Sequence, residues 1–212
     1  MMSPFHFRIA KRLIMPIVIA GLLIGIRIWW VNHHLPQIPV ESYKEKTWVP
    51  LEGAFEEVAN ENGEGTKHYS LMVESAVVRT YDDYLKAHGV TPAHRGAHGT
   101  TPCVVDVAIR VRNDGPGQGG LSIFSMVLVS EQQNQYFVPD VFEKDSLWPQ
   151  VQKGANSTIS IKPGTEFVMH IPYVTNDVGS DVYATPMKDC QFYLLASRMP
   201  TRKLINVSAT VD

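Results

Sequence analysis

The sequence predicts a mainly β protein: an immunoglobulin-like antiparallel β-sandwich with a short helical insertion, preceded by one N-terminal transmembrane helix. Three observations predict this fold: an apolar run near the amino terminus, apolar and polar residues that alternate in most segments after residue 67, and turn-forming residues between those segments. Alternation with a period of two gives each strand one apolar face. Many short strands separated by turns favour a sandwich over a barrel or a parallel sheet.

The apolar run at residues 13–31 predicts a membrane-spanning helix. It is nineteen residues long. At about 1.5 Å per residue, such a helix extends about 28 Å, close to the hydrocarbon thickness of a bilayer. Arg27 lies near its far end, where a long side chain can reach the headgroups. The expected anchor residues are Leu13, Arg27, Trp29, Trp30 and Val31.

The flanks of this run predict its orientation. Arg8, Lys11 and Arg12 precede it, and basic residues favour the cytoplasmic side, whereas the tryptophan pair suits the opposite interface. We therefore expect residues 1–12 in the cytoplasm and the rest of the chain after residue 31 outside the cell membrane. A cleaved signal peptide is the alternative, but the run has no small-x-small cleavage site, which favours an uncleaved single-pass anchor.

Residues 32–66 are expected to form an extracellular stalk. They lack periodicity and include Pro36, Pro39 and Pro50, together with an acidic stretch that contains glycine. One ordered piece is an open alternative: the apolar residues of segment 48–55 could dock on the domain as a first short strand.

Residues 67–212 are expected to form the sandwich. The alternating segments are 69–77, 103–111, 121–130, 135–138, 157–162, 166–174, 190–197 and 203–211. Turn signals separate them, including Pro163-Gly164 between two of the runs.

One helix is expected to interrupt these strands, at residues 79–89. Thr80 is a plausible N-cap with Asp83 three residues later, and Gly89 is a stop signal. We expect the helix to cross one end of the sandwich, with its apolar side formed by Tyr81, Tyr84 and Leu85.

The charge distribution excludes some partner classes. No acidic residue precedes Glu41, and the region after residue 31 holds fifteen basic and twenty-one acidic residues, a formal charge of −6. A mildly acidic domain argues against nucleic acid or an anionic lipid surface as its main partner, because both favour basic patches.

Several segments together resemble a family of uncharacterised exported proteins. These are the basic start, the single membrane helix, Trp48 with the Leu-Glu-Gly-Ala-Phe run at 51–55, the segment 69–76 and the Tyr-Asp-Asp-Tyr-Leu run at 81–85. They resemble membrane-anchored immunoglobulin-like domains of unknown function from Gram-positive bacteria. The resemblance implies a fold and a location, and it implies no catalytic residue.

The two cysteines are the first candidates for chemistry. Cys103 and Cys190 both begin alternating strands, and an even cysteine count in an exported domain suggests a disulfide. Such a bridge could add about 4 kcal/mol of stability. Two buried thiols are the alternative.

A nucleophilic cysteine would make the protein a sortase-like envelope transpeptidase or hydrolase. Neither cysteine carries the Thr-Leu-x-Thr-Cys signature, and the histidine positions do not match that family. We therefore expect no catalytic residue and no enzyme activity, and keep the cysteine enzyme as the alternative function.

Histidines in and before the loop at residues 89–99 are the candidate metal ligands. His88, His94 and His98 could take zinc or copper, which makes a metal-binding exported module a further alternative. The loop contains two glycines, and the histidine spacing fixes no ligand geometry. We therefore prefer a solvated connecting loop, with no metal and no cofactor.

The glycine-rich segment at residues 115–120 matches the residue pattern of a dinucleotide-binding fingerprint. A strand follows it, where the fingerprint requires a helix, so we expect no nucleotide site there.

The leading hypothesis is a non-enzymatic cell-envelope protein whose domain binds another protein or an envelope component. Phe142, Leu147 and Trp148 are the residues we would test as a partner contact, although packing under the sandwich edge is the reading we favour for them. Gly21 and Gly25 form a small-xxx-small motif that would suit a homodimer through the membrane helix.

Overall fold

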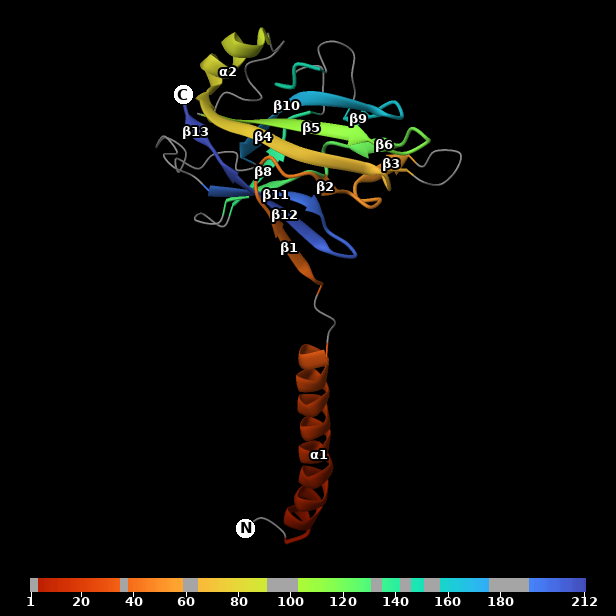
Figure 1. The fold of residues 1–212 in the computed structure, drawn as a ribbon. Helices are drawn as coiled ribbons and strands as arrows, with labels where there is room; N and C mark the ends of the chain where they lie inside the picture. Colours follow the sequence, from red (N-terminus) through yellow and green to blue (C-terminus); the bar gives the residue numbers. More distant parts are fainter. Residues whose placement is uncertain are drawn as a thin grey trace. The chain divides into compact units, whose positions relative to one another are not determined.

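The computed structural model of this chain describes residues 4–34, 38–58, 65–90, 103–130, 135–141, 146–150, 157–175 and 191–212. The chain divides into two compact units, Met1–Ile38 and Pro39–Asp212. Figure 1 shows the first as a single helix and the second as a β structure. Each unit is described by itself.

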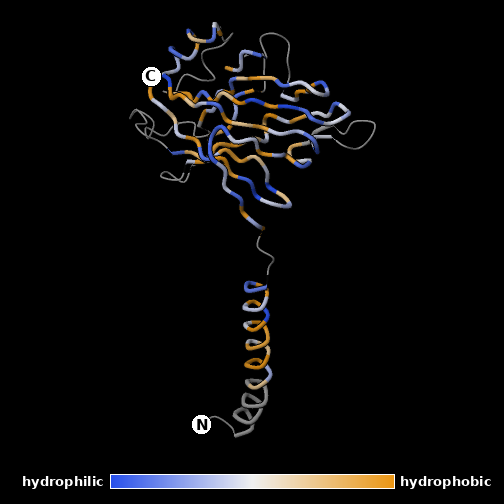
Figure 2. Tube along the Cα trace, viewed as in Figure 1, coloured by the Kyte–Doolittle hydropathy of each residue, from blue (hydrophilic) through white to orange (hydrophobic). Residues whose placement is uncertain are grey.

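The first unit consists of α1 (Pro4–His34). Its segment Met15–His34 is apolar and, with 20 residues, long enough to cross a membrane. In Figure 2 the middle of α1 is mostly hydrophobic. At its end, His33 Nδ1 and His34 Nδ1 lie 2.8 and 2.9 Å from the carbonyl oxygens of Trp29 and Trp30. Each imidazole therefore bonds back to a carbonyl one turn earlier on the same helix. The predicted apolar helix is confirmed.

The second unit contains one further helix and thirteen strands among the described residues. In chain order these are β1 (Val40–Tyr43), β2 (Val49–Pro50), β3 (Glu56–Val58), β4 (Tyr69–Thr80), α2 (Tyr81–His88), β5 (Cys103–Asn113), β6 (Gly120–Ser122), β7 (Leu128–Ser130), β8 (Gln135–Pro139), β9 (Thr158–Ile159), β10 (Thr165–Thr175), β11 (Gln191–Ser197), β12 (Arg202–Ser208) and β13 (Thr210–Val211).

Most of these strands belong to one sheet that nearly closes on itself. Its ten strands run β1-β12-β11-β7-β8-β10-β5-β4-β13, with β2 also paired to β4, and a second sheet has the order β3-β6-β9. Only Ala209 separates β12 from β13, so one stretch of chain pairs with β11 on one side and, through β13, with β4 on the other. The result resembles a barrel.

The prediction of a mainly β fold is confirmed, but its immunoglobulin-like sandwich form is not. One large sheet takes the place of two facing sheets, and two of its pairings, β1 with β12 and β13 with β4, are parallel. An alternating pattern shows which face of a strand is apolar, but it does not show which other strands pair with that strand. The sequence pattern therefore could not separate a sandwich from a nearly closed sheet.

The predicted stalk is wrong for residues 40–58. β1 pairs with β12, β2 pairs with β4 and β3 pairs with β6. Val49 and Leu51 are 0% and 1% exposed, so apolar residues of segment 48–55 dock on the β unit, although β1 and not this segment forms its first strand. These strands contain four residues at most, too short for a readable alternation.

The long strands β4, β5 and β10 separate two apolar clusters. Residues 105, 107, 109 and 111 of β5 belong to the main core. Val104 instead joins Tyr84 and Leu147 in a second cluster. Because successive side chains of a strand point to opposite faces, the second cluster lies on the outer face of the sheet.

α2 forms where local signals predict it and covers part of this outer face. The Asp83 N–H donates to Thr80 Oγ1 over 3.2 Å, which caps the first turn. Gly89 ends the helix with a φ of +63°, a conformation that glycine adopts without steric cost. Tyr84 is fully buried, while Tyr81 and Leu85 pack beside it, as expected.

Candidate functional site

The candidate site is built around Asp106, in the middle of β5. Asp106 shares a strand face with Val104 and lies opposite to the face that packs in the main core. It is only 4% exposed. A buried carboxylate is costly unless it is paired and hydrogen-bonded, so its partners identify what the site is built to hold.

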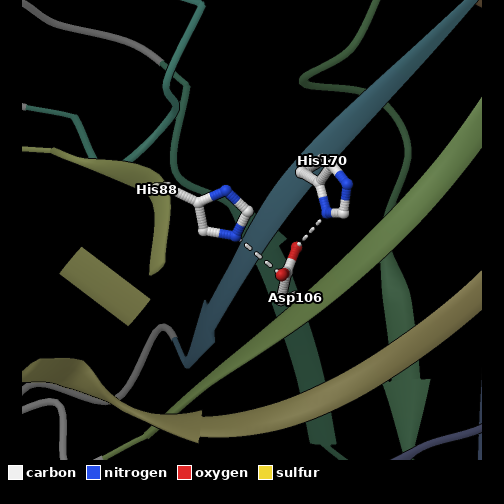
Figure 3. Close-up of side chains that lie close together, drawn as sticks. All are labelled: His88, Asp106 and His170. Carbon is white, nitrogen blue, oxygen red and sulfur yellow. Dashed lines mark hydrogen bonds and ion pairs between the residues drawn. The ribbon is translucent and has the colours of Figure 1, made fainter. Parts of the chain in front are cut away.

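Two imidazoles take one carboxylate oxygen each (Figure 3). His88 Nε2 lies 2.8 Å from Asp106 Oδ2, and His170 Nδ1 lies 3.1 Å from Asp106 Oδ1. An ionised carboxylate can only accept, so both ring nitrogens donate. The two imidazole rings lie 5.0 Å apart between their centroids. The three residues are called the His88-Asp106-His170 cluster below.

Strand register places His170. In the antiparallel β5–β10 pair, Pro172 is opposite Asp106 and His170 is opposite Ala108. His170 is therefore the diagonal neighbour of Asp106 on the same face, within reach of a long side chain.

The short helix places His88. Thr80, at the end of β4, pairs with Cys103 at the start of β5, so α2 begins next to this strand pair. His88 is the last residue of α2. Its ring packs on the ring of Tyr84 one turn earlier, with 4.5 Å between centroids. The cap at Thr80 and the stop at Gly89 thus determine where the His88 imidazole lies.

Among the described residues, Arg79 places a cationic side chain beside the cluster. Its Nε lies 3.7 Å from Asp106 Oδ2, and its Nη1 pairs with the carboxylate of Asp212, the last residue. One arginine therefore lies between two carboxylates, one buried and one exposed. Its charge is balanced largely by Asp212.

The cluster changes the proton affinities of its members. Burial by itself would raise the pKa of Asp106, but the hydrogen bonds from His170 and His88 outweigh burial and lower it. The hydrogen bond to Asp106 raises the pKa of His170, against the opposing effect of burial. Burial, together with the negative charge of Asp106, raises the pKa of Tyr84. The carboxylate is therefore held in its ionised form.

The cluster offers donor atoms that suit a metal ion. One atom from each of the three residues lies within 4.8 Å of the other two. Two imidazole nitrogens and a carboxylate oxygen are ligands that zinc and related divalent ions accept. The expectation of no metal site stays a prediction, and this cluster, which draws its residues from α2, β5 and β10, is the arrangement that could hold one.

Of the three residues in this cluster, only His88 is a candidate metal ligand from the sequence, where it is grouped with His94 and His98. His94 and His98 lie outside the described residues. Asp106 and His170 were missed as ligands. One signal could have found Asp106: it is the only charged residue between Cys103 and Ile109, a segment that is otherwise apolar on both faces of the strand.

The cysteines are not brought to this cluster within the described chain. Cys103 is half-buried and packs against the main core, whereas Asp106 and both imidazoles lie on the other face of the sheet. Cys190 lies outside the described residues. The disulfide between them stays a prediction.

The suggested partner contact is corrected for two of its three residues. Leu147 and Trp148 are both 0% exposed. Leu147 packs with Tyr84 and Val104, and Trp148 belongs to the main core. The favoured alternative of packing is confirmed for these two, because a partner cannot reach side chains that are fully covered. Phe142 lies outside the described residues.

The family model of DUF5028, a domain of unknown function, matches residues 40–203. The match begins at the first residue of β1 and ends inside β12, so it spans most of the β unit. No curated protein matches the chain.

Proposed function

The chain belongs to the DUF5028 family through residues 40–203, and because the description of that family assigns no activity, we propose a function from the architecture of the chain. The protein is a non-enzymatic, single-pass membrane protein that presents its β unit outside the cell as a binding module. Its partner is another protein or an envelope component, and not nucleic acid. The resemblance found in the sequence assigns that envelope to a Gram-positive bacterium.

The apolar surface of α1 carries this proposal. Met15, Ile17, Leu22 and Leu23 are 70%, 68%, 62% and 61% exposed. Leaving large apolar side chains in water costs about 25 cal/mol for each Å². A bilayer removes that cost along the segment Met15–His34, whose 20 residues match the hydrocarbon thickness. The basic residues that precede the apolar segment of α1 in the sequence and the tryptophans near its end support an orientation with the amino terminus inside.

The position of Cys103 supports a non-enzymatic role. A cysteine transpeptidase needs a thiolate next to an imidazole. Cys103 packs towards the core, while the imidazoles of His88 and His170 lie on the opposite face and are directed at Asp106. The His88-Asp106-His170 cluster is therefore better suited to binding than to activating a cysteine nucleophile.

Topology in intact cells tests the proposal. The full chain, tagged at both ends, is expressed in a Gram-positive host, and cells are treated with protease before lysis. We expect a full-length protein that resists alkaline extraction from the membrane, with the carboxy-terminal tag digested and the amino-terminal tag protected.

Two results would overturn the anchor: a shortened protein released to the medium, which indicates a cleaved signal, or a protected carboxy-terminal tag. A variant with Leu22→Lys and Leu23→Lys is the control, because two charges at the middle of the apolar segment oppose insertion by about 5 to 7 kcal/mol. Crosslinking on intact cells then identifies what the exported unit contacts.

A further inference from the structure

We propose that the His88-Asp106-His170 cluster is a binding site for a divalent transition-metal ion, with Zn²⁺ as the reference ligand. The site would use His88 Nε2, His170 Nδ1 and a carboxylate oxygen of Asp106. This inference goes beyond the proposed display function and does not depend on the membrane anchor.

The spacing of the donor atoms fits a single ion. Ligands placed tetrahedrally around Zn²⁺ at about 2.1 Å lie about 3.4 Å from one another. His88 Nε2 and His170 Nδ1 are 2.8 and 3.1 Å from the carboxylate of Asp106, and all three donor atoms lie within 4.8 Å of one another. Rotation of the imidazole side chains adjusts the remaining separation, so that the hydrogen-bonded cluster can become a ligand set.

The donors already converge without an ion. Each imidazole directs one nitrogen at the carboxylate (Figure 3). To ligate an ion with these nitrogens, each neutral ring would carry its proton on the other nitrogen, Nδ1 of His88 and Nε2 of His170. The three ligands come from α2, β5 and β10, whose positions are set by the strand pairing and by the capped helix. Little chain entropy remains to be lost on binding, which favours affinity.

The three side chains of the cluster differ in exposure, and one of them reaches solvent, so an ion has a route to the donor atoms. The side chain of Asp106 is 4% exposed and that of His88 16%, whereas that of His170 is 44% exposed. The carboxylate lies at the closed end, and the cluster opens to solvent beside His170. An ion could enter there and keep water as a fourth ligand, the arrangement of zinc sites with three protein ligands.

Arg79 is the main opposing charge, because a cation near the carboxylate weakens the binding of another cation. Its Nε is 3.7 Å from Asp106, but its guanidinium also pairs with Asp212. The Asp212 carboxylate offsets this charge. The two neutral imidazoles and the Asp106 carboxylate carry a charge of −1, and the charge of Arg79 is paired with Asp212. The ligands therefore present a net negative charge to a divalent ion.

The alternative is a purely structural network in which Asp106 holds α2 on the sheet. Metal titration separates the two. The full-length protein in detergent is stripped with a chelator, and Zn²⁺ binding is measured by calorimetry, with Co²⁺ absorption as a probe of coordination. We expect one ion per chain, and Co²⁺ bands typical of nitrogen and oxygen ligands in a four-coordinate site.

The variants are chosen so that folding and binding can be told apart. His170→Gln removes the most exposed ligand, and we expect at least about 100-fold weaker Zn²⁺ binding with an unchanged circular dichroism spectrum. Asp106→Asn keeps the shape of the side chain and is expected to have a similar effect. His68→Gln makes the same chemical change at a described histidine outside the cluster, and we expect its Zn²⁺ affinity to equal that of the parent.

The proposal is overturned if the stripped protein takes up no stoichiometric Zn²⁺, or if folded His170→Gln binds as tightly as the parent. Should Asp106→Asn fail to fold, His170→Gln alone decides. The topology experiment in cells uses no metal measurement, so failure of the anchor and failure of the metal site are distinguishable.

Discussion

Lys203 on β12 donates from its ammonium to the backbone carbonyl of Pro50 on β2 over 2.8 Å. The lysine is 3% exposed and also pairs with Glu52, whose side chain is 58% exposed. A buried ammonium is stable only with such partners. The pair ties the early segment of the β unit to one of its last strands, across a sequence separation of 153 residues.

We expect Lys203→Met to destabilise the protein. Methionine keeps the apolar stem but leaves the Pro50 carbonyl without its donor, which costs about 1 to 3 kcal/mol in the free energy of unfolding. Urea unfolding followed by circular dichroism measures the change. The control is Glu52→Gln, expected to cost less than about 1 kcal/mol because the carboxylate is exposed. Equal stability of Lys203→Met and the parent would show that the bond contributes nothing.

Two substitutions at Tyr84 should distinguish the contribution of its ring to stability from that of its hydroxyl. Tyr84 is fully buried, and its hydroxyl has no hydrogen-bond partner among the described residues. Tyr84→Phe removes an unsatisfied polar group, and we expect a gain on the order of 1 kcal/mol. Tyr84→Ala should lose about 3 to 5 kcal/mol, because it leaves a cavity under α2. Thermal unfolding compares the two, and a loss in Tyr84→Phe would contradict the unpaired hydroxyl.

The phenol of Tyr43 provides a pH-dependent prediction. Its hydroxyl donates to Glu41 Oε2 over 2.6 Å, and this hydrogen bond, followed by burial and the charge of Glu41, raises the pKa of Tyr43 to about 12. The neutral phenol is favoured in the folded state, so its contribution to stability is complete below the ordinary pKa of about 10 and is lost as the pH rises through 12.

Ultraviolet titration of the phenolate measures this pKa, with Tyr43→Phe subtracted to isolate one residue. We expect Glu41→Gln to move the pKa of Tyr43 back towards 10, since it removes the negative charge of the acceptor. A titration unchanged by Glu41→Gln would mean that the hydrogen bond does not set the pKa.

Gly21 and Gly25 define a prediction about association. Apart from the nearby backbone of α1 itself, no atom of the described residues lies within 4 Å of a Cβ placed at either glycine. The two glycines line a shallow hollow on α1 together with Leu22, Ile26 and Trp29. We propose that two helices meet along this stripe, where small residues allow close backbone contact. Gly21→Leu should then abolish most of the crosslinked dimer in membranes. Ile24→Leu, outside the stripe, is the control, and equal crosslinking in both variants would contradict the contact.

Local signals predicted the elements whose structure depends on nearby residues. The helix at residues 81–88 forms between Thr80 and Gly89 because capping and a left-handed stop act over a few residues. α1 was recognised from its composition and length for the same reason. The residues that face the main core from β5 were likewise readable from a period of two.

Pairing over long distances was not readable in this way. β1 joins β12, and β13 joins β4, although each of these strands has only two to four residues at the contact. Partner choice depends on how the whole sheet curls, and no local pattern records it. The His88-Asp106-His170 cluster could not be predicted for the same reason, because His88 and His170 are 18 and 64 residues away from Asp106 in the sequence.

The sequence by itself determined an apolar helix at the amino terminus, a mainly β unit after it and a capped helix between two long strands, because composition, period and end signals act locally. Only the tertiary structure decided that the sheet nearly closes and that the fold begins at β1. It also decided that a buried carboxylate lies between two imidazoles. The physical reason is that the register of β5 with β10 and the docking of α2 bring these three side chains together, and both depend on packing across the whole unit.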